Sequence, residues 1–256
     1  MINLNRWAMK RNYSALHRLA RRAQRDGFTF PELLLVAAIL ALLAVLALPA
    51  FANNKTRSQR LVCVNNLRQI GIAMQLWGGS REDQAPWRTT VAKGGTSDHP
   101  LAENAWLHFS WISNELASPK VVACPSDASS RSASEWNFGT TGFLNPFYRA
   151  NALSYFVCIH SDFEHPLSWL SGDRNLQGLL YNQACALSLA VGTSAVSAQS
   201  APVSPPVQWT TTEIHAGDGN LLLNGGSVLQ TDNTSLNKSL GQSIWFSSGN
   251  HLLLPR

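Results

Sequence analysis

Two short stretches of the chain concentrate side chains of the types that do chemistry. Residues 160–165 read His-Ser-Asp-Phe-Glu-His, and imidazoles and carboxylates are common metal ligands. Their spacing matches no established zinc pattern, so we interpret the stretch as a solvated loop and keep a metal site as the alternative. Asp173 and Arg174 form the second stretch, as a catalytic pair in a cleft or as a structural ion pair at a turn.

The recurrent enzyme motifs are missing from the sequence. It contains no G-x-S-x-G, no phosphate-binding glycine loop and no H-E-x-x-H, so hydrolase and nucleotide-binding functions have no motif behind them. The net charge of +5 is concentrated in residues 1–27, which carry seven bases and one acid of the 20 bases and 15 acids in the chain. The rest is close to neutral, which gives nucleic-acid binding no electrostatic basis. We expect no enzyme and no cofactor.

The four cysteines, Cys63, Cys124, Cys158 and Cys185, form no C-x-x-C pair, which removes zinc-ribbon and thioredoxin-like interpretations. Three connectivities are open, and the sequence alone does not choose between them. We predict a Cys63–Cys124 bond that clips a helix to the rest of the domain, and a Cys158–Cys185 bond between two apolar runs.

One carboxylate lies at the start of a long apolar run. Gly27-Phe28-Thr29-Phe30-Pro31-Glu32 is followed by 17 residues without a charge, from Leu33 to Pro49. A charge in such a segment is costly unless it has a partner. The basic residues before the segment place its N-terminal side in the cytoplasm, so the remainder of the chain should be exported.

This stretch resembles the type IV prepilin signal of pilins and of the pseudopilins of type II secretion. The resemblance implies that a prepilin peptidase cuts between Gly27 and Phe28 and methylates the new amino terminus. It also implies that Glu32 faces the amine of a neighbouring subunit in a filament, with self, other pilin-like subunits and an inner-membrane assembly platform as partners. An ordinary signal anchor or a cleaved secretory signal is the alternative, but it has no use for Glu32.

Four further patches resemble the group of bacterial pilin-like proteins known as type II secretion protein G-like. They are residues 60–77, 124–127, 170–175 and 215–228. In this context Asp173 and Arg174 are expected to form a structural turn and ion pair. The group usually has Asp before the glycine of the last hairpin, whereas this chain has Gly225, so calcium binding there is in doubt.

The periodicity predicts one long helix from Pro31 to Gly78-Gly79. Pro49 should kink it without ending it, because the helical pattern resumes afterwards. In the second half an apolar stripe at spacings of three and four residues should pack on a sheet; its members are Cys63, Leu67, Ile70, Met74 and Trp77.

The remainder should form a head. We predict a short helix or an irregular apolar segment over 105–117, strands over 120–124 and 154–159, and an apolar run over 179–191 that could be strand or helix. A mobile loop is expected at 192–206, a hairpin around Gly225-Gly226, and a short helix to Leu240 capped by Thr234. Most of the nine tryptophans should be core, with a ligand surface as the alternative.

The fold class predicted is α+β and pilin-like, with a long N-terminal helix on a C-terminal antiparallel sheet. The domains are a cleaved leader (1–27), a transmembrane helix (28–49), its amphipathic continuation (50–77) and a periplasmic head (78–256). The function expected is that of a pilin-like structural subunit in the inner membrane, with its head in the periplasm. The alternative is a membrane-tethered binding or enzymatic domain that uses a prepilin-type signal.

Overall fold

The computed structural model describes residues 27–161, 163–181, 195–198, 206–244 and 250–255. For residues 46–54, 180–181, 195–198, 244 and 250 it describes the backbone alone. The chain divides into two compact units, residues 1–53 and 54–256. Most of the predicted amphipathic segment 50–77 therefore belongs to the same unit as the head.

Helix α2, Phe30–Gly79, is continuous along 50 residues. It begins one residue before Pro31, where the missing N–H of proline has no helical partner to lose. It continues through Pro49 and ends at the predicted Gly78-Gly79 pair. The prediction of one helix with these ends is confirmed, while the kink at Pro49 stays a prediction.

The apolar stripe of α2 is buried in the head, as predicted. Cys63, Leu67 and Ile70 are fully buried, and Met74 and Trp77 are at most 3% exposed. The helix approaches the sheet closely at Gly71, where an added Cβ atom would lie 3.0 Å from the side chain of Leu222. The second part of α2 is thus part of the core of the head.

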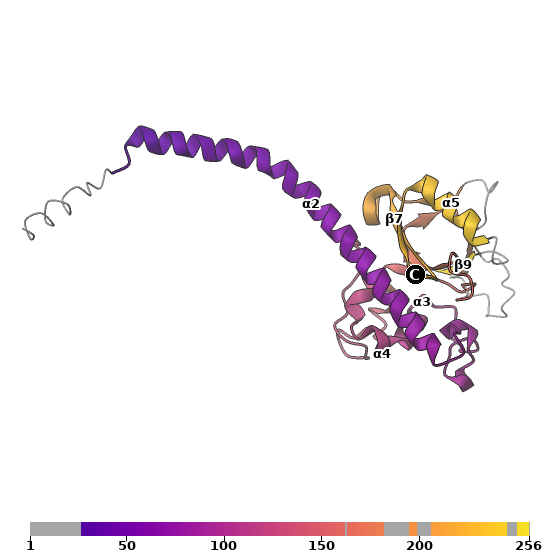
Figure 1. Ribbon diagram of the computed structural model, residues 1–256. Coiled ribbons are helices and arrows are strands. Elements are labelled where there is room, and N and C mark those ends of the chain that lie inside the picture. The colour runs from indigo at the N-terminus through magenta and orange to yellow at the C-terminus, as the bar shows by residue number, and fades with distance from the viewer. Residues whose placement is uncertain (1–26, 162, 182–194, 199–205, 245–249, 256) are drawn as a thin grey trace, which may run out of the picture. The chain divides into compact units, whose positions relative to one another are not determined.

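A seven-stranded antiparallel sheet forms the centre of the head (Figure 1). Its order is β4-β5-β9-β1-β2-β7-β8. The bounds are β1 Tyr155–Cys158, β2 Trp169–Asp173, β4 Leu180–Tyr181, β5 Ala195–Ala198, β7 Gly219–Leu223, β8 Val228–Thr231 and β9 Asn250–Leu253. A small second sheet pairs β3, Leu176–Gln177, with β6, Gln208–Trp209.

Strand β1 is buried on both faces, which explains why its sequence is a continuous apolar run. Tyr155 and Val157 belong to the same hydrophobic cluster as the stripe of α2. Phe156 and Cys158 belong to a second cluster that contains Leu236 and Leu240 of helix α5, Asn233–Ile244. The sheet therefore packs against α2 on one face and against α5 on the other.

Six short helical elements come between α2 and β1 in the sequence. They are η1 Pro86–Arg88, η2 Val91–Lys93, α3 Ala105–Trp111, α4 Ser113–Leu116, η3 Pro119–Val122 and η4 Arg149–Ala152. Helices α3 and α4 confirm the prediction for 105–117. The predicted strand at 120–124 is wrong: Ser118 caps a 3₁₀ turn there, with the Lys120 N–H donating to its hydroxyl oxygen over 3.4 Å.

Three other predictions for the head are confirmed or corrected. The hairpin β7–β8 is formed, and Gly226 takes the positive φ of 81° that its turn requires. The predicted loop 192–206 is wrong at β5, whose residues pair with β4 and β9. Helix α5 is capped by Asp232, which accepts the Ser235 N–H over 2.8 Å, and not by Thr234.

Most tryptophans belong to the core, as predicted. Trp87, Trp169 and Trp209 are the largest fully buried side chains, and Trp77 and Trp106 are less than 9% exposed. Trp245 lies outside the described residues, as do the leader 1–26 and most of the run 179–191.

Candidate functional site

The predicted processing site lies in an open segment. Gly27 and Phe28 precede α2 and are both exposed, and no atom lies within 4 Å of a Cβ added to Gly27. A protease that needs an extended backbone would meet no obstruction from the described residues around this bond. The structure neither includes nor tests the peptidase, so cleavage between these residues stays a prediction.

Glu32 caps the helix at whose start it lies. Its Oε2 atom accepts the backbone N–H of Thr29 over 2.8 Å and the Thr29 hydroxyl over 2.7 Å. This is the reciprocal half of a capping box, in which an acid at the third helical position reaches back to the residue before the helix. The sequence signal Thr-x-x-Glu at 29–32 was available and was missed. Glu32 therefore has a local role in the single chain.

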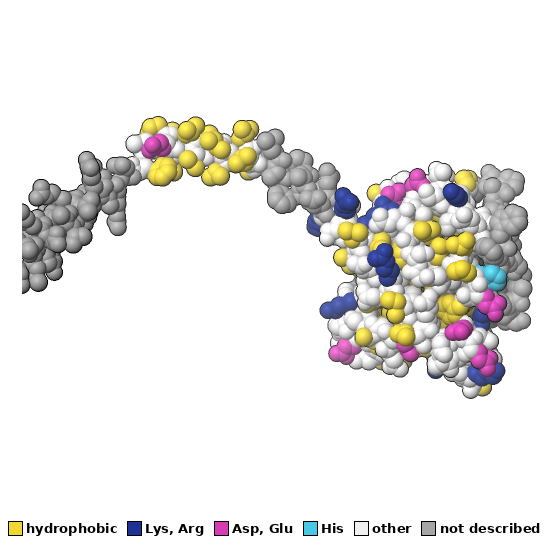
Figure 2. Space-filling model, in the orientation of Figure 1, with side chains coloured by type: hydrophobic (Ala, Val, Ile, Leu, Met, Phe, Trp, Pro, Cys, Tyr) yellow, Lys and Arg dark blue, Asp and Glu magenta, His cyan; other side chains and the backbone are white. Residues whose placement is uncertain are grey.

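The first part of α2 leaves its apolar side chains uncovered. Every residue from 27 to 45 is exposed, although Glu32 is the sole charged residue among them. Figure 2 shows these apolar side chains in yellow along the helix. Among the described residues, no helix combines the length and the apolar character needed to cross a membrane.

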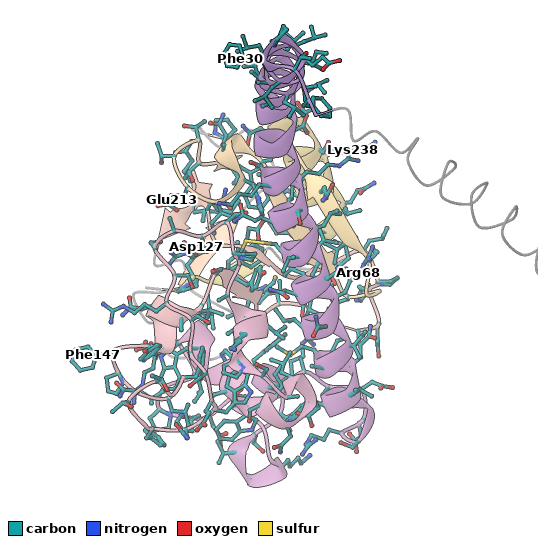
Figure 3. The ribbon with its side chains drawn as sticks, turned by 90° about the vertical axis from the view of Figure 1, so that its left-hand side faces the viewer. Phe30, Arg68, Asp127, Phe147, Glu213 and Lys238 are labelled. Carbon is teal, nitrogen blue, oxygen red and sulfur yellow. A yellow bond between two sulfur atoms is a disulfide. The ribbon has the colours of Figure 1, made fainter. Side chains whose placement is uncertain are left out.

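A disulfide joins the second part of α2 to the head. Cys63 and Cys124 are bonded with their Cα atoms 5.2 Å apart, which forms the first predicted pair. Figure 3 shows the bond in yellow beside α2, next to Asp127. Cys158 is buried in β1, and Cys185 lies outside the described residues, so the second pair stays a prediction.

Asp173, at the end of β2, lies fully buried near this disulfide. Its Oδ2 atom accepts the backbone N–H of Asn220 over 2.7 Å and the Asn220 side-chain amide over 2.8 Å. Burial raises the pKa of Asp173 to about 7, and the two hydrogen bonds from Asn220 lower it only in part. The carboxyl group therefore sits in a site where its charge is only partly compensated.

His215 lies between Asp173 and the disulfide. Its Nε2 atom is 3.5 Å from Asp173 Oδ2 and 3.7 Å from Cys124 Sγ. Burial and the positive charge of Arg60 lower the pKa of His215 to about 4, so the imidazole is neutral at pH 7. The residue belongs to η5, Ile214–Gly217, and has the left-handed φ of 60°. Such a backbone conformation is uncommon for a residue other than glycine.

The predicted Asp173–Arg174 pair is wrong, because neighbouring residues of a strand end point to opposite sides. Arg174 pairs with Asp127, with Nε 2.9 Å from Oδ2 and Nη2 3.0 Å from Oδ1. Asp127 also accepts the Ser154 hydroxyl over 2.8 Å, and Ser154 in turn accepts the Cys124 N–H over 2.9 Å. This network holds the segment that carries Cys124 against β1.

The 160–165 stretch is less solvated than predicted. His160 and Ser161 are buried, and His160 Nε2 lies 2.9 Å from Nδ1 of His251 on β9. Their rings meet edge to face with centroids 4.3 Å apart. Asp162 lies outside the described residues, Glu164 is exposed, and His165 is half-buried. His251 could not be predicted as the partner from the sequence, because the contact depends on β9 pairing with β1.

Gly225 lies in the β7–β8 turn, where a carboxylate would be needed for the doubtful calcium site. Its N–H donates to the carbonyl oxygen of Pro166 over 2.9 Å. An added Cβ atom would lie 3.1 Å from Pro166, so the space for a larger side chain is narrow. The position offers no side-chain ligand to calcium.

Comparison of the chain with protein-family models, with curated proteins and with solved structures found no match. Its function must therefore be argued from its own residues.

Proposed function

We propose that the chain is a pilin-like structural subunit that assembles through the first part of α2. The observation that carries the proposal is the uncovered apolar surface of residues 28–45. Its one carboxylate, Glu32, caps the start of the helix, and a basic leader precedes it in the sequence. Apolar surface of this extent marks a site for lipid or for protein partners. A bilayer covers it in the single subunit, and neighbouring helices cover it in a filament.

The arrangement of the head supports the same function. A long helix whose second part packs on an antiparallel sheet is the pilin-like arrangement that the resemblance implies. The Cys63–Cys124 disulfide fits an exported, oxidising compartment. The predicted membrane segment 28–49 also includes residues 46–49, whose side chains are not described.

The proposal includes location and partners. The leader lies in the cytoplasm, the first part of α2 in the inner membrane and the head in the periplasm. Prepilin peptidase cuts after Gly27, and the subunit then joins copies of itself or other pilin-like subunits at an assembly platform, in a pseudopilus or pilus of the type II secretion kind. The role is structural and needs no catalytic residue, metal or cofactor.

Because Glu32 also accepts a hydrogen bond from Thr29, two substitutions are needed to separate the role of its charge from its role as a helix cap. Glu32→Ala removes both the charge and the cap, whereas Glu32→Gln keeps an oxygen for the Thr29 N–H and removes only the charge. In a filament the carboxylate opposes the Phe28 amine of a neighbour, and breaking such a buried pair costs about 3–5 kcal/mol. Both variants should therefore be processed and inserted normally but fail to assemble.

The measurement is crosslinking between subunits in cells, with a photo-activated residue at Leu42, which is exposed on α2. We expect ladders of crosslinked subunits from the wild type and none from either variant. Ladders from Glu32→Gln but not from Glu32→Ala would assign Glu32 to the cap alone. Equal ladders from all three would favour the membrane-tethered domain instead.

Mass spectrometry of the mature amino terminus tests the processing step separately. We expect a chain that starts at a methylated Phe28. A Gly27→Val variant should keep its leader, because the peptidase must approach the backbone at that residue. A mature chain of normal mass from Gly27→Val would remove the prepilin interpretation.

A further inference from the structure

The disulfide, His215 and Asp173 bring side chains that can bind a metal close together inside the head. His215 Nε2 lies 3.7 Å from Cys124 Sγ and 3.5 Å from Asp173 Oδ2, and the second distance is too long for a normal N–H···O bond. Cys63 Sγ, Cys124 Sγ and a ring nitrogen of His215 all lie within 4.8 Å of one another. The two sulfur atoms and the imidazole thus form a compact group of three metal-ligand types, with the Asp173 carboxylate beside the imidazole.

Two of these separations have the length of an edge of a tetrahedral zinc site. With Zn–S distances of about 2.3 Å and Zn–N and Zn–O distances of about 2.0–2.2 Å, neighbouring donor atoms lie roughly 3.3–3.8 Å apart. The two edges that meet at His215 Nε2 already have this length. The Sγ–Sγ contact is too short for such an edge, because it is a covalent bond of 2.05 Å, and Asp173 lies outside the group of three whose ligand atoms are within 4.8 Å of one another, so its carboxylate must move toward the sulfurs to bind the same ion.

We propose that the reduced head binds one Zn²⁺ ion through the thiolates of Cys63 and Cys124 and the imidazole Nε2 of His215, with the Asp173 carboxylate in the fourth position. A dithiol supplies two electrons and two protons to the disulfide, which yields two thiols and an oxidised dithiol. Zinc then displaces the two thiol protons, which pass to water. The disulfide and the zinc site are thus alternative crosslinks between α2, through Cys63, and the segment of the head that carries Cys124.

The surroundings fit an ion of this charge. Two thiolates, one carboxylate and Zn²⁺ sum to one negative charge. The positive charge of Arg60 acts on both Asp173 and His215, and Arg60 also pairs with Asp218, with Nη1 2.7 Å from Oδ2. The Asn220 amides orient Asp173 in the way that supporting residues orient metal ligands.

The cluster also contains buried polar atoms that lack a hydrogen-bond partner in the described part of the chain. They include Oδ1 of Asp173 and Nδ1 of His215. The Asp173 side chain is fully buried, and its Oδ1 atom is available to a metal ion, whereas its Oδ2 atom already accepts two hydrogen bonds from Asn220.

A cavity gives access to the disulfide. It has a volume of about 490 Å³ and is lined in part by Asn66, Ala123, Cys124 and Asp127. A small reductant and a metal ion can therefore reach Cys124 from one side without passing through the sheet. The opposite side, with Asp173 and Asn220, stays closed.

The test uses the full chain in detergent micelles, reduced by a phosphine because dithiols themselves bind zinc. Zinc affinity is measured by competition with a chromophoric chelator, and Co²⁺ is added in a parallel sample as a spectroscopic probe. We expect one Zn²⁺ per reduced chain and none per oxidised chain. Co²⁺ should give the intense visible bands of a tetrahedral site and a thiolate-to-metal charge-transfer band.

Variants assign the ligands. His215→Gln and Asp173→Asn should weaken zinc binding by at least about tenfold, since even the loss of a residue that only supports a ligand has such effects. His99→Gln is the matched control, because His99 packs on Trp111 away from the cluster and should leave the affinity unchanged. Equal affinity in His215→Gln and wild type would overturn the proposal, and an unchanged Asp173→Asn would remove Asp173 from it.

The proposal can also be tested if the chain unfolds when its disulfide is reduced. If the reduced chain loses its near-ultraviolet circular dichroism, Zn²⁺ must restore that signal in the wild type and not in His215→Gln. A reduced chain that stays unfolded with excess Zn²⁺, or a folded one that binds no more Zn²⁺ than the oxidised form, would contradict the site. The proposal does not depend on assembly, so these outcomes leave the filament function untouched.

Discussion

The two parts of helix α2 differ in whether their apolar side chains are covered by the rest of the chain. Residues 30–45 are apolar on all sides and exposed, with one carboxylate whose partner in the chain is Thr29. Residues 54–79 confine their apolar side chains to one stripe, bury that stripe and add a disulfide. A helix that is hydrophobic all round needs a partner outside the chain, whereas an amphipathic one finds its partner within it. One helix thus contains a part that is left uncovered and a part that completes the core of the head.

The largest expected effect comes from removing the disulfide. Cys63→Ala with Cys124→Ala frees a loop closed over 61 residues, which should lower the free energy of unfolding of the head by about 4 kcal/mol in the chain-entropy model. Chemical unfolding followed by tryptophan fluorescence measures it. Insertion of the first part of α2 should not change, and a variant that stayed as stable as wild type would break the comparison.

Truncating the buried stripe should have the next largest effect. Ile70→Ala removes a fully buried side chain and should cost about 2–5 kcal/mol of head stability. Ile72→Ala, two residues along the same helix, removes an exposed side chain and is the control. Ile39→Ala in the first part should leave head stability unchanged, and equal losses in Ile70→Ala and Ile72→Ala would contradict the packing.

Acid should weaken the head through Asp127. Burial alone would raise the pKa of Asp127, but bonds from Ser154, Ser129 and Arg174 outweigh it and hold the pKa below its ordinary value of 3.8. A lowered pKa in the folded state gives stability that is present above pH 4 and is lost as the pH falls through the folded-state pKa. The stability gap between wild type and Asp127→Asn should therefore narrow in that range, and a gap independent of pH would count against the network.

The smallest effect concerns the cap of the first part. Thr29→Ala removes the hydroxyl that donates to Glu32 and should destabilise the first turn by about 1 kcal/mol. Hydrogen exchange at the Leu33 amide, which donates to the Thr29 carbonyl over 3.1 Å, should become faster. Head stability should stay as in the wild type, and an unchanged Leu33 amide would mean that the cap contributes little.

Local patterns predicted the elements that carry their own signal. The spacing of the α2 stripe, the apolar run of β1 and the Gly225-Gly226 turn each have a periodicity or a turn residue that does not depend on distant partners. Cys63 and Cys124 were paired correctly because one lay on a buried stripe and the other next to a turn.

Several of the predictions that were wrong concern residues whose structure depends on partners distant in the sequence. Strand β5 lies in a charge-free Ser- and Ala-rich stretch and exists because β9 and β4 pair with it. Residues 120–122 look like a strand, but Pro119 at the start of the turn and the Ser118 cap favour a 3₁₀ turn instead. In the cluster of Cys63, Cys124, Asp173 and His215, Asp173 was predicted as a site residue, but with Arg174 as its partner. Arg174 pairs with Asp127 instead, and the contact of Asp173 with His215 was not predicted. The cap by Glu32 was predictable and was missed.

The disulfide also determines which covalent bonds transmit a pulling force from α2 to the sheet. A pull on the amino end of α2 travels along the helix to Cys63, crosses the covalent bond to Cys124 and continues into the sheet. Residues 64–123, with the rest of the stripe and helices α3 and α4, lie in a side loop that such a pull does not stretch. A filament drawn from a membrane would load its subunits at the joint between helix and sheet. The most helical portion of the head would stay mechanically at rest while the oxidised bond is intact.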